Sequence, residues 1–360
     1  MSTVIPSVLV LCKTLRKGGA EKQAMIAAKL LSRQGMPVTI IIWNGTKMDP
    51  ANLRYLEDQH IICIGLQGNL YRKFTDFRNY IIQHRITLIL SYLTLANFLG
   101  AVASLCKHSL IIIGGIRSEK LPFLKFLVER YVHNHVNNCT VFNSYAAMEG
   151  FVRRGFDPDK SFVIHNAAIT HPYNEMPHDG NEIRLISVSR FVKSKDFSTA
   201  LKSFGYLVDK YPEKKIRFLI VGYGKCESYI RGLIRKYDLE TRAELIIDPP
   251  NISELLTHSD IYLSTSLIEG LSNSIMEAMA AGLPVVATDV GDNRYLIEDS
   301  KNGYIVPCGN PEVIARKLEQ LVLSEDIRNK FGEYSHYKIN AEFNEDKMLT
   351  KYITLIEGLT

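Results

Sequence analysis

The sequence predicts an α/β protein made of two doubly wound domains, each with a parallel sheet covered by helices on both faces. Short, continuous apolar segments alternate with helical segments along most of the chain, a pattern typical of parallel strands that are buried on both faces. The alternation stops once, at residues 169–182, and then starts again. A chain of 360 residues is also longer than one hydrophobic core usually supports, so two domains are expected.

The first predicted domain covers residues 1–168. Its expected strands are short runs rich in Val, Ile and Leu, and its expected helices space their apolar residues for one buried face. Gly35 ends the first helix. The expected strands are 8–12, 37–43, 61–64, 88–92, 110–114, 140–143 and 162–165, and the expected helices are 20–32, 71–85, 96–107 and 122–136.

Residues 169–182 are polar, contain two prolines and follow no period, so they are the predicted linker. The second predicted domain, 183–343, repeats the alternation of strands and helices. Residues 344–360 are expected to form one more amphipathic helix. The expected strands are 183–187, 216–221, 243–247, 260–266, 284–290 and 304–306. The expected helices are 197–210, 227–237, 253–258, one that carries Glu277 and ends at Gly282, a short one that follows a turn at Gly291, and one that starts at Pro311 with Asn310 as its N-cap.

The composition favours a soluble, cytoplasmic protein. Hydrophobic residues make up 46% and charged residues 22% of the chain, and the net charge of +5 is modest. The six cysteines show neither a CxxC pair nor a zinc-site spacing, which favours a reducing compartment. We expect no secretory leader and no membrane span. The basic residues form no tract, so nucleic-acid binding is not expected.

The stretch 265–297 carries the most specific chemical pattern. Glu269 lies where a predicted strand ends, and Glu277 follows eight residues later in a predicted helix. Ligands of parallel sheets bind at the carboxyl ends of strands, and amides at a helix N-terminus bind anionic oxygens. Ser274 and Glu277 also fit a capping box, so the spacing alone leaves a structural role open. The loop between the two glutamates is Gly270, Leu271, Ser272, Asn273 and Ser274.

Glu269-x7-Glu277, followed by the string AMAAGLPVVAT at 278–288, resembles the signature of glycosyltransferase family 4. These are retaining, nucleotide-sugar-dependent enzymes of the GT-B fold. The resemblance implies two Rossmann-like domains facing a central cleft, with the acceptor on the N-terminal domain and the nucleotide sugar on the C-terminal domain. It also implies that helix 344–360 packs back on the N-terminal domain. It covers nearly all of the C-terminal half but mainly residues 17–21 of the N-terminal half.

Cations that could receive the leaving diphosphate follow the first strand of the second domain. Arg190 and Lys195 resemble the family's G-R-x4-K segment, in which both side chains bind the diphosphate. A guanidinium can contact two oxygens at once, whereas an ammonium acts as a point charge. Ser189 and Asp196 stand where the family usually has glycine, which puts the loop geometry in doubt. A solvated basic loop is the alternative interpretation.

The resemblance gives roles to other residues. Glu277 would bind the ribose hydroxyls, Glu269 the transferred sugar, and the amides of 271–274 the sugar and phosphate. Gly222 belongs to a V-G-x-G turn that shapes a loop near the nucleotide. Gly18 and Gly19, in the string Lys17-Gly18-Gly19-Ala20-Glu21, resemble the family's N-terminal glycine loop, where the backbone approaches phosphate.

Arg117 follows the strand 110–114, where relatives carry a polar residue. It is a candidate for binding a phosphate of the donor or of the acceptor, with an ion pair to Glu119 as the alternative. Asn166 matches a family asparagine but is expected to be a structural cap. Asp157-Pro158-Asp159 fits a metal-binding D-x-D pattern, yet its polar surroundings favour a turn. We therefore expect no metal and no cofactor beyond the nucleotide sugar.

The expected activity is transfer of a hexose or N-acetylhexosamine, with retention, from a nucleotide sugar to a glycan or polyprenyl-diphosphate-linked acceptor. A UDP-sugar is favoured, and the setting is polysaccharide, lipopolysaccharide or capsule-type biosynthesis. A non-hydrolysing nucleotide-sugar epimerase and a non-catalytic sugar-nucleotide-binding subunit remain open. The basic, aromatic segments 71–80 and 120–132 are either sheet-covering helices or a weak peripheral contact with the inner face of the cytoplasmic membrane.

Overall fold

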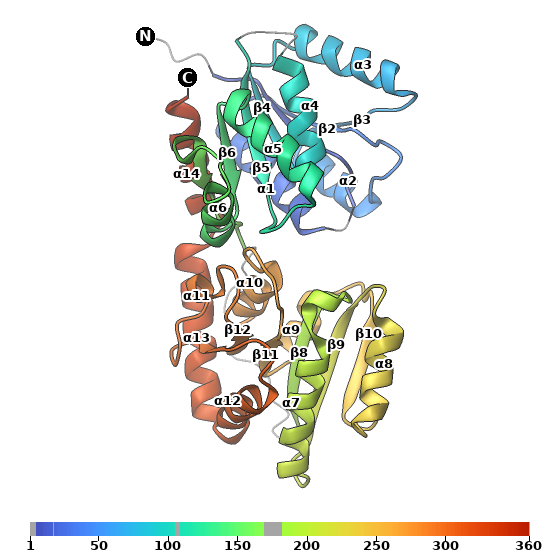
Figure 1. The fold of residues 1–360 in the computed structure, drawn as a ribbon, viewed down its shortest axis with the longest axis vertical. Coiled ribbons are helices and arrows are strands. Elements are labelled where there is room, and N and C mark those ends of the chain that lie inside the picture. Colours follow the sequence, from blue (N-terminus) through green and yellow to red (C-terminus); the bar gives the residue numbers. More distant parts are fainter. Residues whose placement is uncertain (1–4, 17, 105–108, 169–181, 360) are drawn as a thin grey trace. The chain divides into compact units, whose positions relative to one another are not determined.

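The computed structural model describes residues 5–16, 18–104, 109–168 and 182–359. It contains two units, Met1–Ala167 with Glu345–Thr360, and Ala168–Asn344 (Figure 1). Lys17 and nearly all of the predicted linker, 169–181, lie outside the described residues. The two predicted parallel sheets are confirmed, one in each unit.

The first unit is organised around a seven-stranded parallel sheet with the order β3-β2-β1-β4-β5-β6-β7. Val8 of β1 pairs with Val38 of β2 and also with Leu88 of β4. The chain thus builds outward from β1 in one direction and then from β4 in the other, so β1 and β4 flank the topological switch point, where ligands of such sheets bind. The strands are β1 Val8–Cys12, β2 Val38–Ile42, β3 Ile62–Gly65, β4 Leu88–Tyr92, β5 Ile111–Ile116, β6 Cys139–Phe142 and β7 Ser161–Val163.

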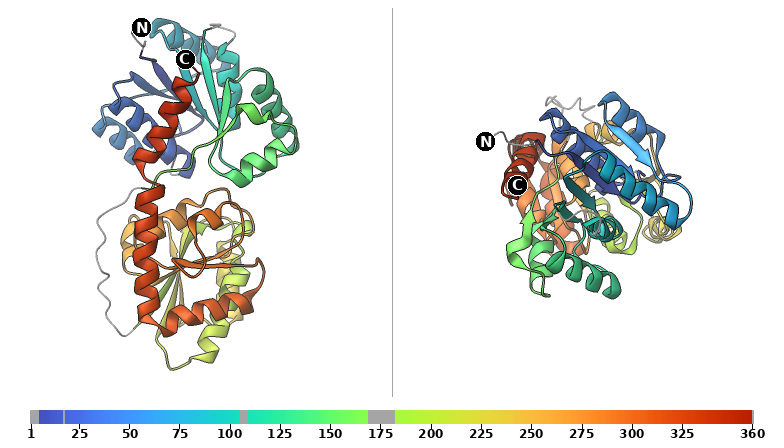
Figure 2. Two further views of the ribbon diagram at one scale, coloured as in Figure 1. Left: turned by 90° about the vertical axis from the view of Figure 1, so that its left-hand side faces the viewer. Right: turned by 90° about the horizontal axis from the view of Figure 1, so that it is seen from above.

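Helices cover both faces of this sheet, and the C-terminal helix α14 is one of them. Helix α14 packs against α1, and Figure 2 shows it in red beside the strands of this unit. The Tyr352 hydroxyl of α14 lies 3.0 Å from that of Tyr92, and Lys29 of α1 pairs with Glu345. The helices are α1 Gly19–Arg33, α2 Pro50–Asp58, α3 Leu70–Gln83, α4 Thr94–Ser104, α5 Phe123–His135, α6 Tyr145–Val152 and α14 Glu345–Glu357, with a 3-10 turn at Pro158–Lys160.

The second unit has a six-stranded parallel sheet with the order β10-β9-β8-β11-β12-β13. Its switch point lies between β8 and β11, which pair in parallel through Leu185 and Ile261. Ile220 of β9, Leu263 of β11 and Val286 of β12 are fully buried. Burial on both faces of the sheet explains the continuous apolar runs in the sequence. The strands are β8 Ile183–Arg190, β9 Ile216–Tyr223, β10 Ala243–Ile247, β11 Ile261–Ser264, β12 Val285–Thr288 and β13 Gly303–Val306.

The helices of the second unit include one that the sequence analysis missed, α13. Arg328, Ser335 and Lys338 are buried along it together with Phe331 and Ile339, so polar residues interrupt the apolar pattern of its inner face. Asn310 caps α12 through the Val313 amide, with Pro311 in the first turn, as predicted. None of the described helices is long and apolar enough to cross a bilayer. The helices are α7 Phe197–Lys210, α8 Glu227–Lys236, α9 Ile252–Thr257, α10 Asn273–Ala280, α11 Asn293–Leu296, α12 Pro311–Leu323 and α13 Glu325–Glu342, with a 3-10 turn at Lys193–Lys195.

A polar cluster ties α13 to the loop that follows α11. Glu298 accepts hydrogen bonds from Lys338 at 2.7 Å, Lys301 at 2.8 Å and the Tyr334 hydroxyl at 3.2 Å. Lys338 is almost fully buried, with 6% of its side chain exposed. The two lysines, Lys301 first, lower the pKa of Glu298 to about 2, so the folded protein favours the carboxylate.

This cluster predicts a pH-dependent stability. Because the folded-state pKa is depressed, the stabilisation by Glu298 is complete above the ordinary carboxyl pKa and is lost as the pH falls toward about 2. Glu298→Gln should therefore lower the urea midpoint of the second unit at pH 7 and change it progressively less between pH 4.5 and pH 2.5. Glu240→Gln, at an exposed turn position, serves as the control. If Glu298→Gln lowered the urea midpoint by the same amount at pH 7 and at pH 2.5, the depressed pKa of Glu298 would be contradicted.

Candidate active site

A small pocket marks the carboxyl ends of β8 and β11, at the switch point of the second sheet. It holds only about 10 Å³, roughly one water, and it forms the floor of the site rather than a seat for a whole ligand. A larger pocket lies in the first unit. Most of the residues that line the small pocket carry a hydroxyl group. The lining residues are Ser187, Val188, Ser189, Lys195, Phe197, Tyr262, Leu263, Ser264, Thr265, Ser266 and Ser274.

Lys195 and Glu269 meet directly in this site. The Lys195 ammonium donates to Glu269 Oε1, and the Ser266 hydroxyl donates to the same oxygen at 2.7 Å. The side chains of Lys195 and Glu269 are 16% and 13% exposed, so solvent screens this pair less than a surface pair. The structure thus joins two of the predicted site residues, which lie 74 positions apart.

Hydrogen bonds hold the two loops that carry this ion pair against each other. Thr265 donates to the carbonyl oxygens of Lys195 and Asp196 at 2.9 and 3.0 Å, and the Leu267 amide donates to Ser194 O at 2.8 Å. Thr288, at the end of β12, donates to Ser266 O at 2.6 Å and is fully buried. Rigid hydroxyl contacts therefore fix both ends of the ion pair.

Glu277 belongs to the same neighbourhood through Tyr262. Burial raises the pKa of Tyr262 well above its usual range, a Ser274 hydrogen bond lowers it, and the negative charges of both Glu269 and Glu277 raise it further. Both carboxylates therefore lie close enough to act on one buried phenol. The capping-box interpretation of Ser274 and Glu277 is wrong, because α10 begins at Asn273 with Ser272 at its N-cap, and the Ser272 side chain makes no cap hydrogen bond.

Arg190 ends β8 at the same edge of the sheet and is exposed. Among the described residues, its side chain makes no hydrogen bond or ion pair, so the guanidinium is available to an incoming anion. Asp196, which replaces a family glycine, has a left-handed backbone with φ of 47° and caps α7 through the Thr199 amide. Aspartate tolerates this conformation better than most residues, which explains how the loop keeps its shape without glycine.

Two glycines let backbone segments approach this site closely. A Cβ on Gly222 (φ 149°) would lie 1.8 Å from Ser189 O, so the end of β9, where the V-G-x-G string begins, packs closely against the end of β8. A Cβ on Gly291 (φ 53°) would lie 2.2 Å from Glu269 O and 2.4 Å from Gly270 O. The Asp292 amide also donates to Gly270 O at 3.0 Å. The turn at Gly291 thus supports the loop that carries Glu269.

The remaining predicted site residues belong to the first unit. Arg117 follows β5, and its guanidinium donates to Asn166 Oδ1 and to the Tyr352 hydroxyl, both at 3.2 Å. It also stacks over the Tyr92 ring, 4.7 Å from the centroid. Its Nε is buried and has no hydrogen-bond partner in the described part of the chain. These hydrogen-bond partners are neutral, and the positive charge of Arg117 lies at the carboxyl edge of β4 and β5.

The glycine loop of the first unit holds a carboxylate where the sequence predicted a phosphate. Gly18 is the N-cap of α1, and a Cβ on Gly18 would lie 2.3 Å from Glu21 Oε2. The Thr14 hydroxyl donates to the other oxygen of Glu21 at 3.0 Å. Glu21 therefore fills the space beside Gly18 at the positive end of the helix dipole.

The D-x-D string is a turn. The Asp157 side chain accepts the Asp159 amide at 3.0 Å and caps the 3-10 turn Pro158–Lys160, which confirms the structural interpretation of this string. Over the described ranges, His, Cys, Asp and Glu side chains form no group of three or more placed to hold a metal ion.

Comparison with solved structures identifies the fold. The structure of Anabaena HepE in complex with UDP-glucose superposes with a TM-score of 0.86 and 18% sequence identity, covering 98% of this chain and 99% of HepE. The protein therefore has the GT-B fold that the resemblance implied.

Comparison with known sequences points to the same class of protein. The glycosyl transferases group 1 model matches residues 174–337. N-Acetyl-alpha-D-glucosaminyl L-malate synthase of Bacillus anthracis is 29% identical over 48% of this chain and 44% of its own length. Poly(ribitol-phosphate) alpha-N-acetylglucosaminyltransferase of Staphylococcus aureus is 28% identical over 65% and 46%. The chain spans about half the length of these curated relatives.

Sequence reasoning missed several residues that hold the predicted site residues, or the loops that carry them, in position. Ser266, Thr288 and Gly291 are small residues in loops, and only Gly291 was noted, as a turn. Tyr352 was hidden in the C-terminal helix, far in sequence from Arg117. A signal was available for Ser266, because it lies three residues before Glu269 and a serine at that spacing can reach a carboxylate in a turn.

The close approach at Gly291 gives a testable expectation. Gly291→Ala should destabilise the second unit by about 1–3 kcal/mol, because the methyl group meets two carbonyl oxygens and the backbone is left-handed. Gly205→Ala is the matched control, since nothing lies within 4 Å of a Cβ there, and in helix α7 it should stabilise by roughly 0.5–1 kcal/mol. Urea unfolding of both variants measures the difference. An unchanged midpoint for Gly291→Ala would show that the loop contact is absent.

Proposed function

We propose that this protein is a retaining glycosyltransferase that moves a hexose or N-acetylhexosamine from a UDP-sugar to a glycan or lipid-linked glycan. The observation that carries the proposal is the Lys195–Glu269 ion pair, which lies at the switch point of the second sheet and within the matched family domain. Ligands of doubly wound sheets bind at this point, and the family supplies the reaction class.

The side chains fit the electrostatics of the proposed reaction. When the bond between the sugar and the diphosphate breaks, negative charge grows on the departing phosphate, and prepositioned cations and dipoles stabilise it. Lys195 supplies a fixed ammonium, exposed Arg190 a guanidinium, and the N-terminus of α10 its amides. Glu269 would bind the hydroxyls of the transferred sugar and Glu277 those of the ribose. No divalent metal is needed in this scheme.

Retention of configuration is assigned to a front-face path. The bond from the anomeric carbon to the phosphate oxygen breaks while the acceptor hydroxyl attacks the same face. The departing phosphate oxygen takes the acceptor's proton, so the charges balance without a separate base. Glu269 forms no covalent bond in this path, and its pairing with Lys195 supports a binding role.

The comparisons favour UDP as the nucleotide and a glycan as the acceptor. HepE was crystallised with UDP-glucose, and the two curated relatives named above transfer N-acetylglucosaminyl groups. On this chain, the positive charge of Arg117 and its neutral hydrogen-bond partners suit a phosphate carried by the acceptor. We extend these properties to the present protein as part of the proposal.

A thermal-shift panel tests the donor. UDP-sugars should raise the melting temperature more than GDP- or ADP-sugars at equal concentration, because a ligand stabilises the state that binds it. EDTA should leave the shift unchanged. A shift that requires a divalent metal, or a larger shift with GDP- or ADP-sugars, would contradict this part of the proposal.

A matched pair of variants localises the binding in the same assay. Arg190→Leu should weaken UDP binding roughly tenfold or more, because a hydrogen bond to a charged group contributes about 1.5–3 kcal/mol. Lys193→Leu removes an equally exposed cation three residues away and should leave the shift unchanged. Equal behaviour of the two variants would exclude a specific role for Arg190.

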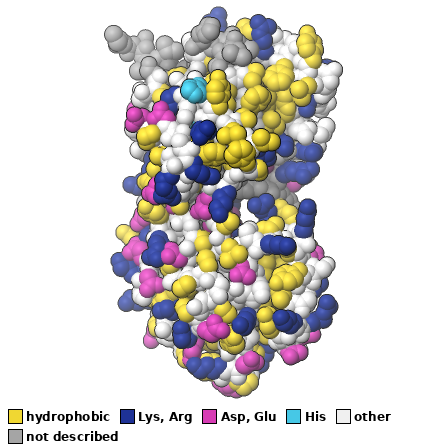
Figure 3. All heavy atoms as spheres, viewed as in Figure 1, with side chains coloured by type: hydrophobic (Ala, Val, Ile, Leu, Met, Phe, Trp, Pro, Cys, Tyr) yellow, Lys and Arg dark blue, Asp and Glu magenta, His cyan; other side chains and the backbone are white. Residues whose placement is uncertain are grey.

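We extend the proposal to a weak contact with an anionic membrane surface through α5. The outward side chains of this helix are apolar or basic: Phe123 and Leu124 are 73% and 76% exposed and Tyr131 64%, and Lys125 is exposed. Glu129, the one acidic residue of the helix, is 2% exposed. Figure 3 shows apolar side chains gathered among Lys and Arg over this part of the first unit. Such a face suits anionic lipid.

Flotation with liposomes tests the membrane contact. Binding to vesicles containing phosphatidylglycerol should occur at low salt and fall at high salt, because screening weakens the basic residues' attraction. Tyr131→Ser should reduce this binding at least threefold. Tyr337→Ser is the matched control, since Tyr337 is 65% exposed on α13, and it should bind as the wild type does. Absence of low-salt binding by the wild type would count against the contact.

A further inference from the structure

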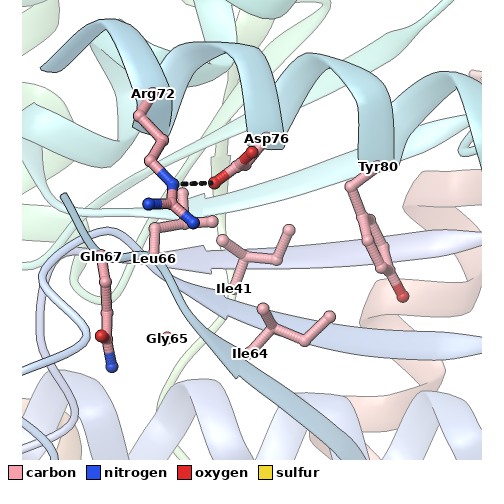
Figure 4. A pocket seen from close by; sticks show the side chains of 8 residues that line it. All are labelled: Ile41, Ile64, Gly65, Leu66, Gln67, Arg72, Asp76 and Tyr80. Carbon is pink, nitrogen blue, oxygen red and sulfur yellow. Dashed lines mark ion pairs between the residues drawn. The ribbon is translucent and has the colours of Figure 1, made fainter. Parts of the chain in front are cut away.

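The larger pocket of the first unit lies between α3 and the edge of the sheet. It has a volume of about 380 Å³, which falls within the range of small-molecule sites. Figure 4 shows Arg72, Asp76 and Tyr80 projecting from α3 over the side chains of Ile41 and Ile64. Leu66, Gly65 and Gln67 complete the lining.

The pocket exists because α3 covers the sheet edge incompletely. Helix α3 buries only Phe77 and Ile81, which pack on the inner strands. β3 is the edge strand, and its side chains on the face of α3 remain accessible, with Ile62 59% exposed and Ile64 half-buried. An apolar strip along the edge strand therefore lies beneath α3 but is not filled by its side chains.

The side of α3 that overhangs this strip is polar. Arg72, Asp76 and Tyr80 recur every four residues and so share one stripe of the helix. Arg72 Nε lies 3.8 Å from Asp76 Oδ2, with side-chain exposures of 74% and 48%, so this ion pair contributes little to stability. The Tyr80 hydroxyl is fixed by Thr39 at 2.9 Å. The pocket therefore has an apolar floor, a fixed phenol, and a donor beside an acceptor at its rim.

This combination selects a class of ligand. The Asp76 carboxylate would repel a phosphate or a nucleotide. A hydrocarbon would displace water from Arg72 and Asp76 and offer no hydrogen bonds in place of those that the water made. A neutral pyranose ring offers an apolar face for Ile64 and Leu66 and hydroxyls that both donate and accept. Neighbouring hydroxyls can bond to a carboxylate and a guanidinium at the same time.

The sheet order places the pocket at a distance from the switch point of the same unit. All strands of this sheet are parallel, so the carboxyl ends of β3 and β4 lie on one edge. Three strand spacings of about 4.8 Å separate them, or roughly 14 Å. A ligand that reaches from Arg117, beyond β4, to this pocket is longer than a single sugar.

We infer that the pocket formed by Ile41, Ile64, Leu66, Arg72, Asp76 and Tyr80 is a subsite for a neutral sugar residue of an oligosaccharide acceptor. The inference rests on the proposed function, because it assigns the acceptor to a class: a glycan of several residues whose distal, uncharged sugar lies under α3. Its occupancy does not depend on the nucleotide, so it can be measured separately.

Saturation-transfer NMR on the full chain tests the subsite with three neutral trisaccharides, maltotriose, cellotriose and chitotriose. At least one should receive saturation from the wild type, and its Kd should rise at least tenfold in Arg72→Leu and in Asp76→Leu. The control is Arg153→Leu, which breaks another exposed i, i+4 ion pair of this unit, with Glu149 at 3.6 Å. It should bind as the wild type does.

Three outcomes would overturn the inference: no saturation transfer to any of the trisaccharides, equal binding by the pocket variants and the wild type, or displacement of the sugar by inorganic phosphate. The UDP-induced melting shift, measured on the same samples, keeps this separate from the proposed function. A normal UDP shift with no trisaccharide binding refutes the subsite alone. Trisaccharide binding without any UDP shift refutes the proposed donor and leaves the subsite standing.

Discussion

The second unit depends on one constraint, the pairing of Lys195 with Glu269 in a largely desolvated place. Burying two charges is costly unless each finds a partner and further hydrogen bonds. Here Ser266 supplies the further hydrogen bond, and Thr265 and Thr288 fix the loops on either side. The arrangement holds an ammonium in position before any anion arrives, which is the preorganisation that stabilisation of a departing phosphate requires.

Each unit repeats one architectural principle at the carboxyl edge of its parallel sheet. In the second unit the edge carries the ion pair, exposed Arg190 and the α10 N-terminus. In the first it carries Arg117, stacked on Tyr92 and bonded to Tyr352 of the C-terminal helix. The strand ends thus place an ion pair beside an exposed guanidinium in one unit and a buried guanidinium with neutral hydrogen-bond partners in the other.

Much of this could be predicted from sequence because it depends on local pattern. Continuous apolar runs predicted nearly all of the strands, and the glutamate spacing with its following string indicated the family. The α13 helix was missed because Arg328, Ser335 and Lys338 interrupt the apolar residues on its buried face. These polar side chains find their partners only in the folded unit. The same reason hid the roles of Ser266 and Thr288, whose hydroxyls matter only through partners elsewhere in the fold.

The sequence by itself determined the two parallel sheets, the resemblance to a glycosyltransferase family and the residue types at the strand ends, since periodicity and motif spacing are properties of the chain alone. The tertiary structure decided which of those residues meet. It joined Lys195 to Glu269, placed Glu21 in the glycine loop where a phosphate was expected, and left an apolar pocket under α3. These outcomes depend on long-range packing and on competition for buried hydrogen bonds, which sequence spacing does not encode.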